Sequence, residues 1–428
     1  TFIWPDLLVS LAHKMGVKAI STRNVTDIDD VLTHAAWRRG ERPDEFAVTQ
    51  EFLFDQDMKA LNIARPDAAP RARAYVPQIV AFVDALIALG AAYEVGGTVF
   101  FRADDMSRPE GAASAFAEFG DNAVPDGRQG QWDVAVWKAS AADDPGWPSP
   151  WGWGRPGWHV ECAAMAAAVL GTSIDVLAGG ADLVFPHHAY QSAMASTVSG
   201  CRFARREMHI GTVWCEGAKM AKSTGNLVLV SDLLNEVPAE VVRFLLLNRS
   251  WSQQWTYNAQ LVTTAQSELE GLHQAAGRAG SDGEDEVMAA LINDLDVPRA
   301  FEIALDRGGR AARLLADLLK VGGSGASGGI EDPAHDQQSA KHFSQRRALT
   351  KCCPGREHSD HRNEHRPRRN LAGGVSAHEQ GPDAVTDHRG QEYDVQQAAN
   401  RGQCACSERS AECMADSVRA VEAQRQQT

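Results

Sequence analysis

Apolar residues recur three and four positions apart in many stretches of this sequence, and polar or glycine-rich segments separate those stretches. That spacing puts the apolar side chains on one face of an α-helix, so each stretch predicts an amphipathic helix. Shorter apolar runs lie between them and are long enough only for β-strands. The predicted helices cover residues 6–15, 46–61, 76–89, 161–170, 230–234, 239–247, 260–279 and 286–319, the last with a break near Pro298.

Two of the short apolar runs predict strands of a parallel sheet. Residues 17–20 are expected to form a buried strand that opens into the polar loop RNVTDIDD at 23–30, and residues 173–177 are expected to form another. A helix, a strand and a polar loop at the strand's carboxyl end make half of a nucleotide-binding βαβ unit.

The region from about 66 to 150 is expected to be an insertion between two halves of that sheet. Within it, YEVGGTVFF at 93–101 predicts a hairpin that turns at Gly96 and Gly97, and residues 125–150 are expected to be mostly loop. The predicted fold is therefore a doubly wound α/β domain with an insertion, followed by an all-α extension.

The composition narrows the class of protein. The 428 residues are enough for two domains, and the net charge of −14 argues against a broad basic surface, although RNA can still dock on a local basic patch. No stretch reaches the roughly 18 apolar residues of a membrane helix, and the N-terminus lacks the pattern of a signal peptide. We therefore expect a soluble cytoplasmic protein with reduced thiols at Cys162, Cys201 and Cys215.

The segment 322–428 differs from the rest of the chain. All eleven tryptophans precede Tyr257, and this segment holds about eleven large apolar side chains in no helical or strand period. It cannot bury enough apolar surface to offset its chain entropy, so disorder is predicted. Our hypothesis is that it is translated out of frame, and the hypothesis fails if neither other reading frame of the gene continues the helical pattern. Its cysteines, at 352, 353, 404, 406 and 413, fit no usual zinc spacing.

Three motifs follow one another in the middle of the chain. They are GWGRPGWHVEC at 152–162, GGADLVFPHH at 179–188 and KMAKSTGN at 219–226. The first ends in a thiol close to an indole. The second joins a glycine turn and a carboxylate to two imidazoles, and the third is a loop that carries two lysines. Together they suit a nucleotide-dependent, metal-assisted activation of a small substrate.

The second and third motifs each allow a functional and a structural interpretation. Gly179 and Gly180 permit close backbone approach to a nucleotide, and the Asp182 carboxylate can accept hydrogen bonds from ribose hydroxyls; a tight turn is the alternative. Lys219 and Lys222 can neutralise the charge that develops as pyrophosphate leaves; a solvated basic turn is the alternative.

In this order, the three motifs resemble those of the cysteine-activating class I aminoacyl-tRNA synthetases and of the related mycothiol cysteine ligases. The resemblance extends over roughly residues 1–315 and includes RNVTDIDD at 23–30, FDQDMKALNI at 54–63 and VWKASAADDPGWPSPWG at 136–152. It implies a Rossmann-like class I catalytic domain. It also implies an enzyme, a ligase that converts ATP and cysteine to cysteinyl adenylate and pyrophosphate and then passes the cysteinyl group to an acceptor.

Two acceptors are open. DMKALNI and RNVTDIDD are more similar to the enzymes that charge the 3′ end of a tRNA. NLVLVS at 226–231 and the aromatic Tyr190 are more similar to the enzymes that act on the amine of glucosaminyl-inositol. We favour tRNA as the partner.

The resemblance also assigns residues to ATP. KMAKS matches the KMSKS loop of class I enzymes, which implies that Lys219 and Lys222 are catalytic and contact the phosphates. The match of GGADLVFPHH implies that Gly179, Gly180 and Asp182 bind ATP.

Further residues are assigned to cysteine and to zinc. The resemblance implies that Trp158 and Thr26 contact the substrate cysteine and that Cys162 and His187 hold Zn²⁺; a thiolate and neutral imidazoles are good zinc ligands, and ordinary packing is the alternative. The family's glutamate ligand is replaced by Gln191, and its cysteine ligand near the N-terminus has no counterpart here. We expect Cys162 and His187 to lie close together at the carboxyl edge of the sheet.

The class I enzymes also carry a His-x-Gly-His sequence that grips the phosphates of ATP, and this sequence contains none. By the resemblance, Thr1 falls shortly after that motif, so we expect an N-terminally truncated catalytic domain at 1–256. A helical extension at 257–321 and the tail at 322–428 are expected to follow. An inactive fragment or pseudoenzyme is therefore a further interpretation.

Overall fold

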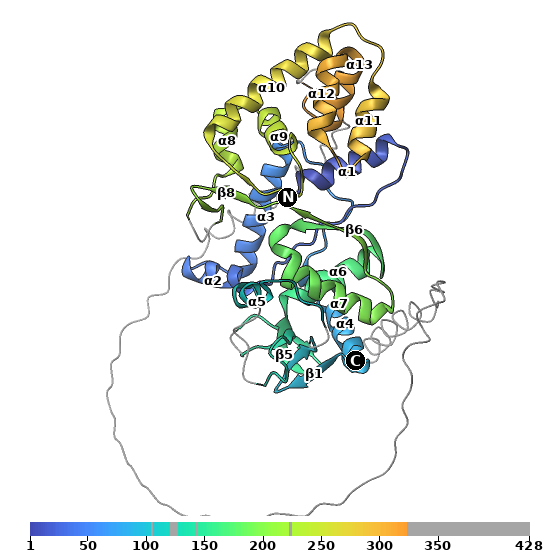
Figure 1. The fold of residues 1–428 in the computed structure, drawn as a ribbon. Coiled ribbons are helices and arrows are strands. Elements are labelled where there is room, and N and C mark those ends of the chain that lie inside the picture. The colour runs from blue at the N-terminus through green and yellow to red at the C-terminus, as the bar shows by residue number, and fades with distance from the viewer. Residues whose placement is uncertain (104–105, 120–126, 142–143, 222–224, 323–428) are drawn as a thin grey trace, which may run out of the picture. The chain divides into compact units, whose positions relative to one another are not determined.

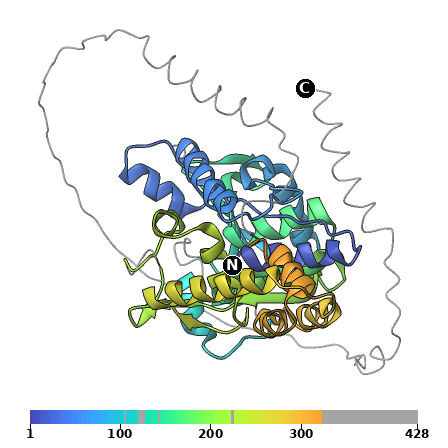
Figure 2. The same ribbon diagram turned by 90° about the horizontal axis from the view of Figure 1, so that it is seen from above.

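The computed structural model describes residues 1–103, 106–119, 127–141, 144–221 and 225–322. All of these residues belong to one compact unit. Lys222 and the segment 323–428, for which disorder is predicted, lie outside the described residues. Figures 1 and 2 show the ribbon from two directions.

The described strands form three small sheets. One is antiparallel, in the order β1-β2-β3-β5-β4; one is the parallel pair β6-β7; the third has the order β10-β8-β9. The strands are β1 (Ala92–Val95), β2 (Thr98–Phe101), β3 (Val134–Ala139), β4 (Trp147–Ser149), β5 (Gly152–Pro156), β6 (Ile174–Gly180), β7 (Ala204–Ile210), β8 (Val213–Cys215), β9 (Ala218–Lys219) and β10 (Trp255–Thr256).

Helices connect and cover these sheets (Figure 1). All eight predicted helical stretches are helical, although the ends differ by a few residues. The α-helices are α1 (Ile3–Lys14), α2 (Asp30–Arg38), α3 (Pro43–Ala60), α4 (Val76–Ala88), α5 (Ala112–Phe119), α6 (Trp158–Leu170), α7 (Ala189–Ser199), α8 (Val230–Glu236), α9 (Ala239–Leu247), α10 (Ala259–Gly277), α11 (Glu284–Ile292), α12 (Val297–Arg307) and α13 (Gly309–Leu319). Three short turns of other helical types are η1 (Ala72–Ala74), η2 (Ala181–Leu183) and η3 (Val184–His188).

The parallel pair β6-β7 positions the central motif. Helix α7 lies in the chain between the two strands, as a parallel connection requires. Helices α6 and α7 pack on each other and share one buried cluster with the first residues of both strands. The motif GGADLVFPHH follows from β6 through η2 and η3, so its side chains lie at the carboxyl end of the strand, where α/β proteins place their ligands.

The predicted strand at 17–20 is wrong. Val17 and Ile20 are 54% and 60% exposed, and neither lies in a strand. Pairing occurs slightly later in the chain, as isolated parallel bridges from Thr22 to Ala68 and from Val25 to Arg71. An apolar run forms a buried strand only where a neighbouring backbone is in register with it, and here that backbone faces residues 22–25.

The predicted hairpin is confirmed, because β1 and β2 pair antiparallel around Gly96 and Gly97. The loop prediction for 125–150 is wrong in part, since β3 and β4 lie within it. The residues Val134 to Trp137 in β3 are all buried. A strand covered on both faces is a continuous apolar run without alternation, and the surrounding prolines and glycines obscured it.

The helical extension consists of α10 to α13. Two of its helices, α10 and α12, begin at capping residues: the side chains of Asn258 and Asp296 accept hydrogen bonds from the backbone N–H of Leu261 and Arg299. The predicted helix at 286–319 is divided into α11, α12 and α13. One break precedes Pro298 and another falls at Gly308, which has a φ of 63°.

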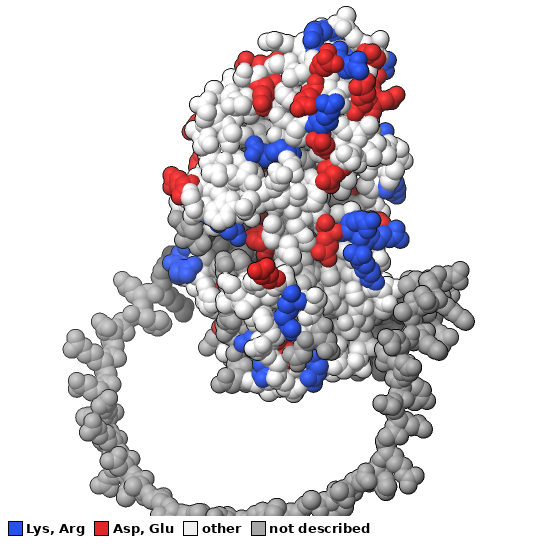
Figure 3. Space-filling view, viewed as in Figure 1, with Lys and Arg blue, Asp and Glu red and all other residues white. Residues whose placement is uncertain are grey.

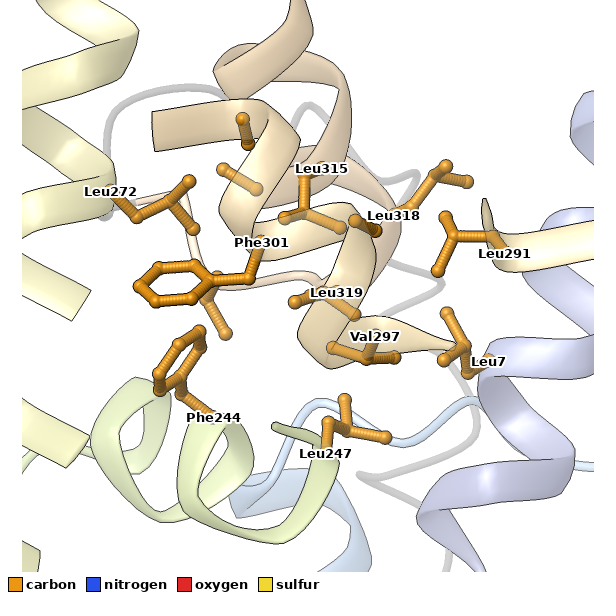
Figure 4. Packing of buried hydrophobic residues seen from close by; sticks show 14 of the residues in the cluster. Leu7, Phe244, Leu247, Leu272, Leu291, Val297, Phe301, Leu315, Leu318 and Leu319 are labelled. Atoms are coloured by element: carbon orange, nitrogen blue, oxygen red, sulfur yellow. The ribbon is translucent and has the colours of Figure 1, made fainter. Parts of the chain in front are cut away.

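Two large buried clusters stabilise the described unit, beside a small one of Tyr93, Phe100 and Ala135. The first, which we call the extension core, contains apolar residues of α1 and α9 together with those of α10 to α13. Figure 4 shows Leu7 of α1, Leu247 of α9 and Leu319 of α13 around the same interior. The second cluster joins α4, α6, α7, the antiparallel sheet and the start of the parallel pair. The extension therefore shares a core with the first helix of the chain.

Candidate functional site

Trp158 and His187 lie against each other. Trp158 opens α6, and Gly157 precedes it at a point where an added Cβ would collide with the carbonyl oxygen of Ala135. The chain therefore passes close to β3 before the helix begins. The indole stacks on the His187 imidazole with ring centres 4.1 Å apart and an angle of 19° between the planes. Trp158 is half-buried, whereas His187 is buried.

A second histidine restrains His187. The Nδ1 atoms of His159 and His187 are 3.1 Å apart, so one ring donates a proton and the other accepts it. Burial, with a smaller contribution from Lys138, lowers the pKa of His159 to about 3. Burial, together with His159 and His188, holds the pKa of His187 well below its ordinary value. Both imidazoles are therefore neutral at pH 7 and present a polar, uncharged surface.

His188 continues the row of histidines towards the parallel strands. Its Nδ1 lies 2.8 Å from Nε2 of His209, which stands on β7 opposite Gly179 of β6. A Cβ on Gly179 would lie 2.5 Å from Cε1 of His188. The absence of a side chain at Gly179 thus leaves room for the His188 ring. Burial is also the main reason that the pKa of His188 falls to about 4.

Cys162 lies one helical turn after Trp158, on the same face of α6. It is buried, and the Asn24 side chain donates to its backbone carbonyl at 3.3 Å. Burial, and next the neighbouring Glu161, raise the pKa of the thiol to about 12, so the thiol is protonated at neutral pH. Glu161 is itself buried, and its Oε2 has no hydrogen-bond partner.

These residues do not by themselves make a zinc site. A structural zinc ion takes four protein ligands and a catalytic one about three. Within the described ranges, no group of three or more histidine, cysteine or acidic side chains is arranged to hold a metal ion. The position four residues after His187 is the buried amide Gln191, which is a poor zinc ligand. The donor set falls short of the one that the resemblance implies.

A cavity of about 240 Å³ lies beside the carboxyl end of β6; we call it the Lys219 cavity. The Nζ of Lys219 is 3.2 Å from Oδ2 of Asp182, so a cation and an anion share one wall. An added Cβ on Gly180 would collide with the Asp182 carboxylate, which therefore bends back over the strand end. The lining residues are Thr1, Ile3, Trp4, Gly180, Asp182, Ile210, Gly211, Thr212, Val213, Lys219, Met220, Leu227, Leu246 and Trp255.

The structure brings the predicted site residues together in two groups. Gly180, Asp182 and Lys219 line the Lys219 cavity. Trp158 and His187 form the stacked pair, and Cys162 lies on the next turn of α6. Gly179 connects the groups, because the His188 ring fills the space above it. Thr26 is half-buried in the loop before α2, and Lys222 lies outside the described residues.

Two histidines of this site were not predicted from the sequence. His159 directly follows Trp158, and no sequence spacing indicates that its side chain would contact His187. His209 is far along the chain from His188, and only the parallel register of β6 and β7 brings it close. One feature of the sequence could have indicated them. WHVEC, FPHH and MHIG each have a histidine next to an apolar residue, and that neighbour is buried in the structure.

None of the helices in the described part of the chain has both the length and the apolar character needed to cross a membrane.

Comparison with known proteins gives relatives over most of the described chain. Residues 1–267 match the family of tRNA synthetases class I (C), catalytic domain. The chain is 38% identical to the cysteine–tRNA ligase of Rhodospirillum rubrum over 317 residues, which are 70% of this chain and 68% of that one. It is 36% identical to the cysteine–tRNA ligase of Xanthomonas euvesicatoria, with 75% and 71% of the two chains covered.

A solved structure supports the fold. Mycobacterium tuberculosis methionyl-tRNA synthetase, in complex with methionyl-adenylate, superposes with a TM-score of 0.52 at 16% identity. The superposition covers 82% of this chain and 80% of that one. The α/β class predicted from the sequence is thus confirmed, although within the described residues the one sheet that is parallel throughout has only two strands, β6 and β7, and the other parallel pair, β8 and β10, belongs to a mixed sheet.

Proposed function

Because this chain belongs to the class I tRNA synthetases of the cysteine type, we propose that it activates cysteine with ATP and transfers the cysteinyl group to tRNA. The observation that carries the proposal is the placement of the second and third motifs around one cavity. Gly180 and Asp182 from one motif and Lys219 from the other line it together.

ATP is assigned to the Lys219 cavity. In the proposed reaction the carboxylate of cysteine attacks the α-phosphate, and the protein mainly positions the reactants and stabilises the departing pyrophosphate. Lys219 supplies a cation at the cavity wall, held at 3.2 Å by Asp182. Asp182 is also suited to accept hydrogen bonds from the ribose hydroxyls. Gly179 and Gly180 have no side chains, so the nucleotide could approach the backbone at the end of the strand. Lys222, assigned by the KMSKS resemblance, would add a second cation.

Cysteine is assigned to the surface that Trp158 and His187 form. The stacked rings are uncharged at neutral pH because burial suppresses protonation of the imidazole. An uncharged aromatic wall suits a small thiol-bearing side chain. Thr26, half-buried in the loop before α2, is proposed to contact the substrate from the other side. Zinc at Cys162 and His187 stays an expectation from the resemblance, and no step of the proposed reaction depends on it.

The acceptor is proposed to be tRNA. The two relatives described above are both cysteine–tRNA ligases, and tRNA is the acceptor they name. On the face shown in Figure 3, lysine and arginine side chains lie in small groups among acidic ones. RNA would therefore dock through a local group of basic residues. The division into a catalytic domain at 1–256 and a helical extension at 257–321, and a cytoplasmic location, belong to this proposal.

The test is direct binding combined with exchange. We expect the chain to bind a non-hydrolysable cysteinyl-adenylate analogue at least about tenfold more tightly than the seryl analogue, because a pocket that fits one side chain loses contacts with another. Lys219→Ala should weaken both analogues, since both carry the phosphate-like linker. Lys14→Ala on α1 is the matched control. Equal affinity for both analogues would refute cysteine activation.

Cysteine-dependent exchange between ATP and pyrophosphate is the second measurement. Exchange that falls strongly in Lys219→Ala and Lys222→Ala supports the complete reaction. Binding of the analogue without exchange would instead support the alternative of an inactive fragment or pseudoenzyme.

A further inference from the structure

Arg243 is a buried cation at the centre of α9. It is 1% exposed, and its guanidinium donates to four acceptors in three parts of the chain. Nη1 donates to the carbonyl oxygens of Leu61 and Asn62 at 2.9 and 3.2 Å, after the end of α3. Nε donates to the carbonyl of Leu319, the last residue of α13. Nη2 donates to the carboxylate of Asp6 at 2.5 Å.

Asp6 is the matching buried anion, in the first turn of α1. It accepts from Arg243, from Nζ of Lys320 at 2.7 Å, and from the backbone N–H of Ala64 at 2.9 Å. Burial alone would raise the pKa of Asp6, but the charges of Arg243 and Lys320 outweigh burial and lower it. The carboxylate is thus ionised and fully paired. Asp6, Arg243 and Lys320 form one network that joins α1, α9 and the end of α13.

The same helices build two walls of the Lys219 cavity. Ile3 and Trp4, in the first turn of α1, line the cavity and lie less than one turn before Asp6. Leu246 lines it from α9, three positions after Arg243 and on the same side of that helix. A rotation or shift of either helix would therefore change the cavity wall, and the network restrains both helices against such a movement.

Lys320 brings the helical extension into this arrangement. It has a left-handed backbone with a φ of 53°, and its N–H donates to Asp317 while that of Val321 donates to Ala316. The carbonyl of Val321 lies 2.6 Å from Nε2 of His273 on α10. The position of the Lys320 side chain thus depends on how α13 docks on α10.

We propose that Asp6, Arg243 and Lys320 are positioning residues for the Lys219 cavity, and that they couple nucleotide binding there to the docking of the last turn of the helical extension. The identity of the ligand as ATP rests on the proposed function. Thermodynamic linkage makes the effect mutual. A ligand that stabilises the cavity also stabilises the docking of the end of α13, and a change that destabilises this docking lowers the affinity for the ligand.

Lys320→Met tests this network most cleanly. Lys320 is 23% exposed in its side chain and its removal leaves the Asp6–Arg243 pair intact, so the chain should fold. We expect the full 428-residue chain to bind ATP at least about fivefold more weakly in this variant, the lower end of typical couplings between sites. The affinity for cysteine should change less than about twofold, because α6 and η3 are not held by the network. Lys320→Arg should restore ATP binding, and Lys14→Met on α1 should leave it unchanged.

Amide hydrogen exchange supplies a readout that does not need ATP. Exchange over 1–14 and 239–247 should be faster in Lys320→Met than in the wild type or in Lys14→Met. In the wild type, saturating ATP should slow exchange over 309–320, and this slowing should vanish in Lys320→Met.

Either of two results would overturn the proposal: unchanged exchange over 1–14 in Lys320→Met, or unchanged ATP affinity with faster exchange. If the wild type itself binds no ATP, the proposed function fails, and exchange over 1–14 alone then decides whether the network positions α1.

Discussion

His187 is restrained from two directions, by the ring of Trp158 on one side and by the Nδ1 atom of His159 on another. Each restraint removes rotational freedom from a side chain to which we assign the substrate cysteine. A side chain held in this way needs little reorganisation when a substrate arrives, which preserves binding free energy. His159 and His187 are thus held in place without carrying charge.

Trp158→Ala should weaken cysteine binding by about 2- to 10-fold, because a stacked aromatic pair contributes roughly 0.5–1.5 kcal/mol. ATP affinity should change less, since Trp158 does not line the Lys219 cavity. Separate titrations with cysteine and with ATP check this. Trp37→Ala, which removes a 45% exposed indole from α2, is the control and should affect neither ligand. An equal loss of affinity for both ligands would mean that Trp158 only stabilises the fold.

The ion pairs of Asp30 make the stability of the protein depend on pH. Its carboxylate accepts from Nζ of Lys138 at 2.9 Å and from Nε of Arg155 at 2.8 Å. Burial alone would raise the pKa of Asp30, but these two cations outweigh burial and lower it. Because the folded state binds this proton less readily than the unfolded state, the stabilisation is complete above the ordinary carboxyl pKa of about 3.9. It is lost as the pH falls below that value.

Asp30→Asn should therefore lower the free energy of unfolding by about 1–2 kcal/mol at pH 7, a partly exposed pair being screened by water. The difference from the wild type should shrink as the pH falls from about 4 towards 3. Urea unfolding at several pH values measures it. Asp175→Asn breaks an exposed pair with Arg205 and should change little at any pH. A difference that grows in acid would contradict the assigned direction.

Single residues could be assigned from the sequence only where a motif fixed their neighbours. Trp158, His187 and Gly179 stand inside such motifs, and the structure groups them. The partners of Asp30 could not be found this way, because Lys138 lies 108 positions away and no local pattern links an α2 carboxylate to β3. Contacts of that length depend on the tertiary fold, which the local sequence does not encode.

The helices of the extension follow from local sequence more closely than the strands do. A helix is stabilised within its own segment, by apolar spacing and by a capping side chain at its start. A strand depends on a partner elsewhere, so residues 17–20 have the composition of a strand without forming one, while β3 forms where loop residues dominate the region. The helices of the extension could therefore be predicted from the sequence, whereas the strand predicted at 17–20 is wrong and β3 could not be predicted.

Asp296→Ala should destabilise the protein by about 1 kcal/mol, the usual cost of an N-cap side chain. The lost interaction is the hydrogen bond from the N–H of Arg299 to the Asp296 carboxylate at 3.1 Å. Thermal and urea unfolding measure the change. Asp306→Ala, near the carboxyl end of the same helix, should cause no loss, because a negative charge there opposes the helix dipole. Equal losses in both variants would mean that the cap contributes nothing.

The extension core makes α1, α9 and α10 to α13 one packed body. Leu7 and Leu319 are both 0% exposed in it, although they come from opposite ends of the described chain (Figure 4). The resemblance marked the extension as a separate segment, and no periodicity could show that its inner face also covers α1. The predicted boundary between the catalytic domain and the extension follows the order of the chain, whereas the core is formed by helices that are close in space.

Leu7→Ala and Leu319→Ala should each lower the free energy of unfolding by about 2–5 kcal/mol, the cost of a cavity in a well-packed core. Circular dichroism and tryptophan fluorescence should report the same transition in each variant, because both residues belong to one cluster. Leu53→Ala, at a 53% exposed position of α3, is the control, with an expected change within about 0.5 kcal/mol. A transition of α1 that precedes that of the extension would show that the core is not shared.

The separation of 314 positions between Asp6 and Lys320 has a consequence for how the protein is made. A chain leaves the ribosome from its N-terminus, and segments fold as their partners emerge. The inner face of α1, with Ile3, Trp4 and Leu7, must wait for α13, the last described helix, before it can be covered. Until then those side chains are open to chaperones or to other nascent chains, and pairing across so long a loop makes the final step slow. Within the described chain, the side chains of α1 are thus synthesised before those of α13 but gain this cover only after α13 has emerged.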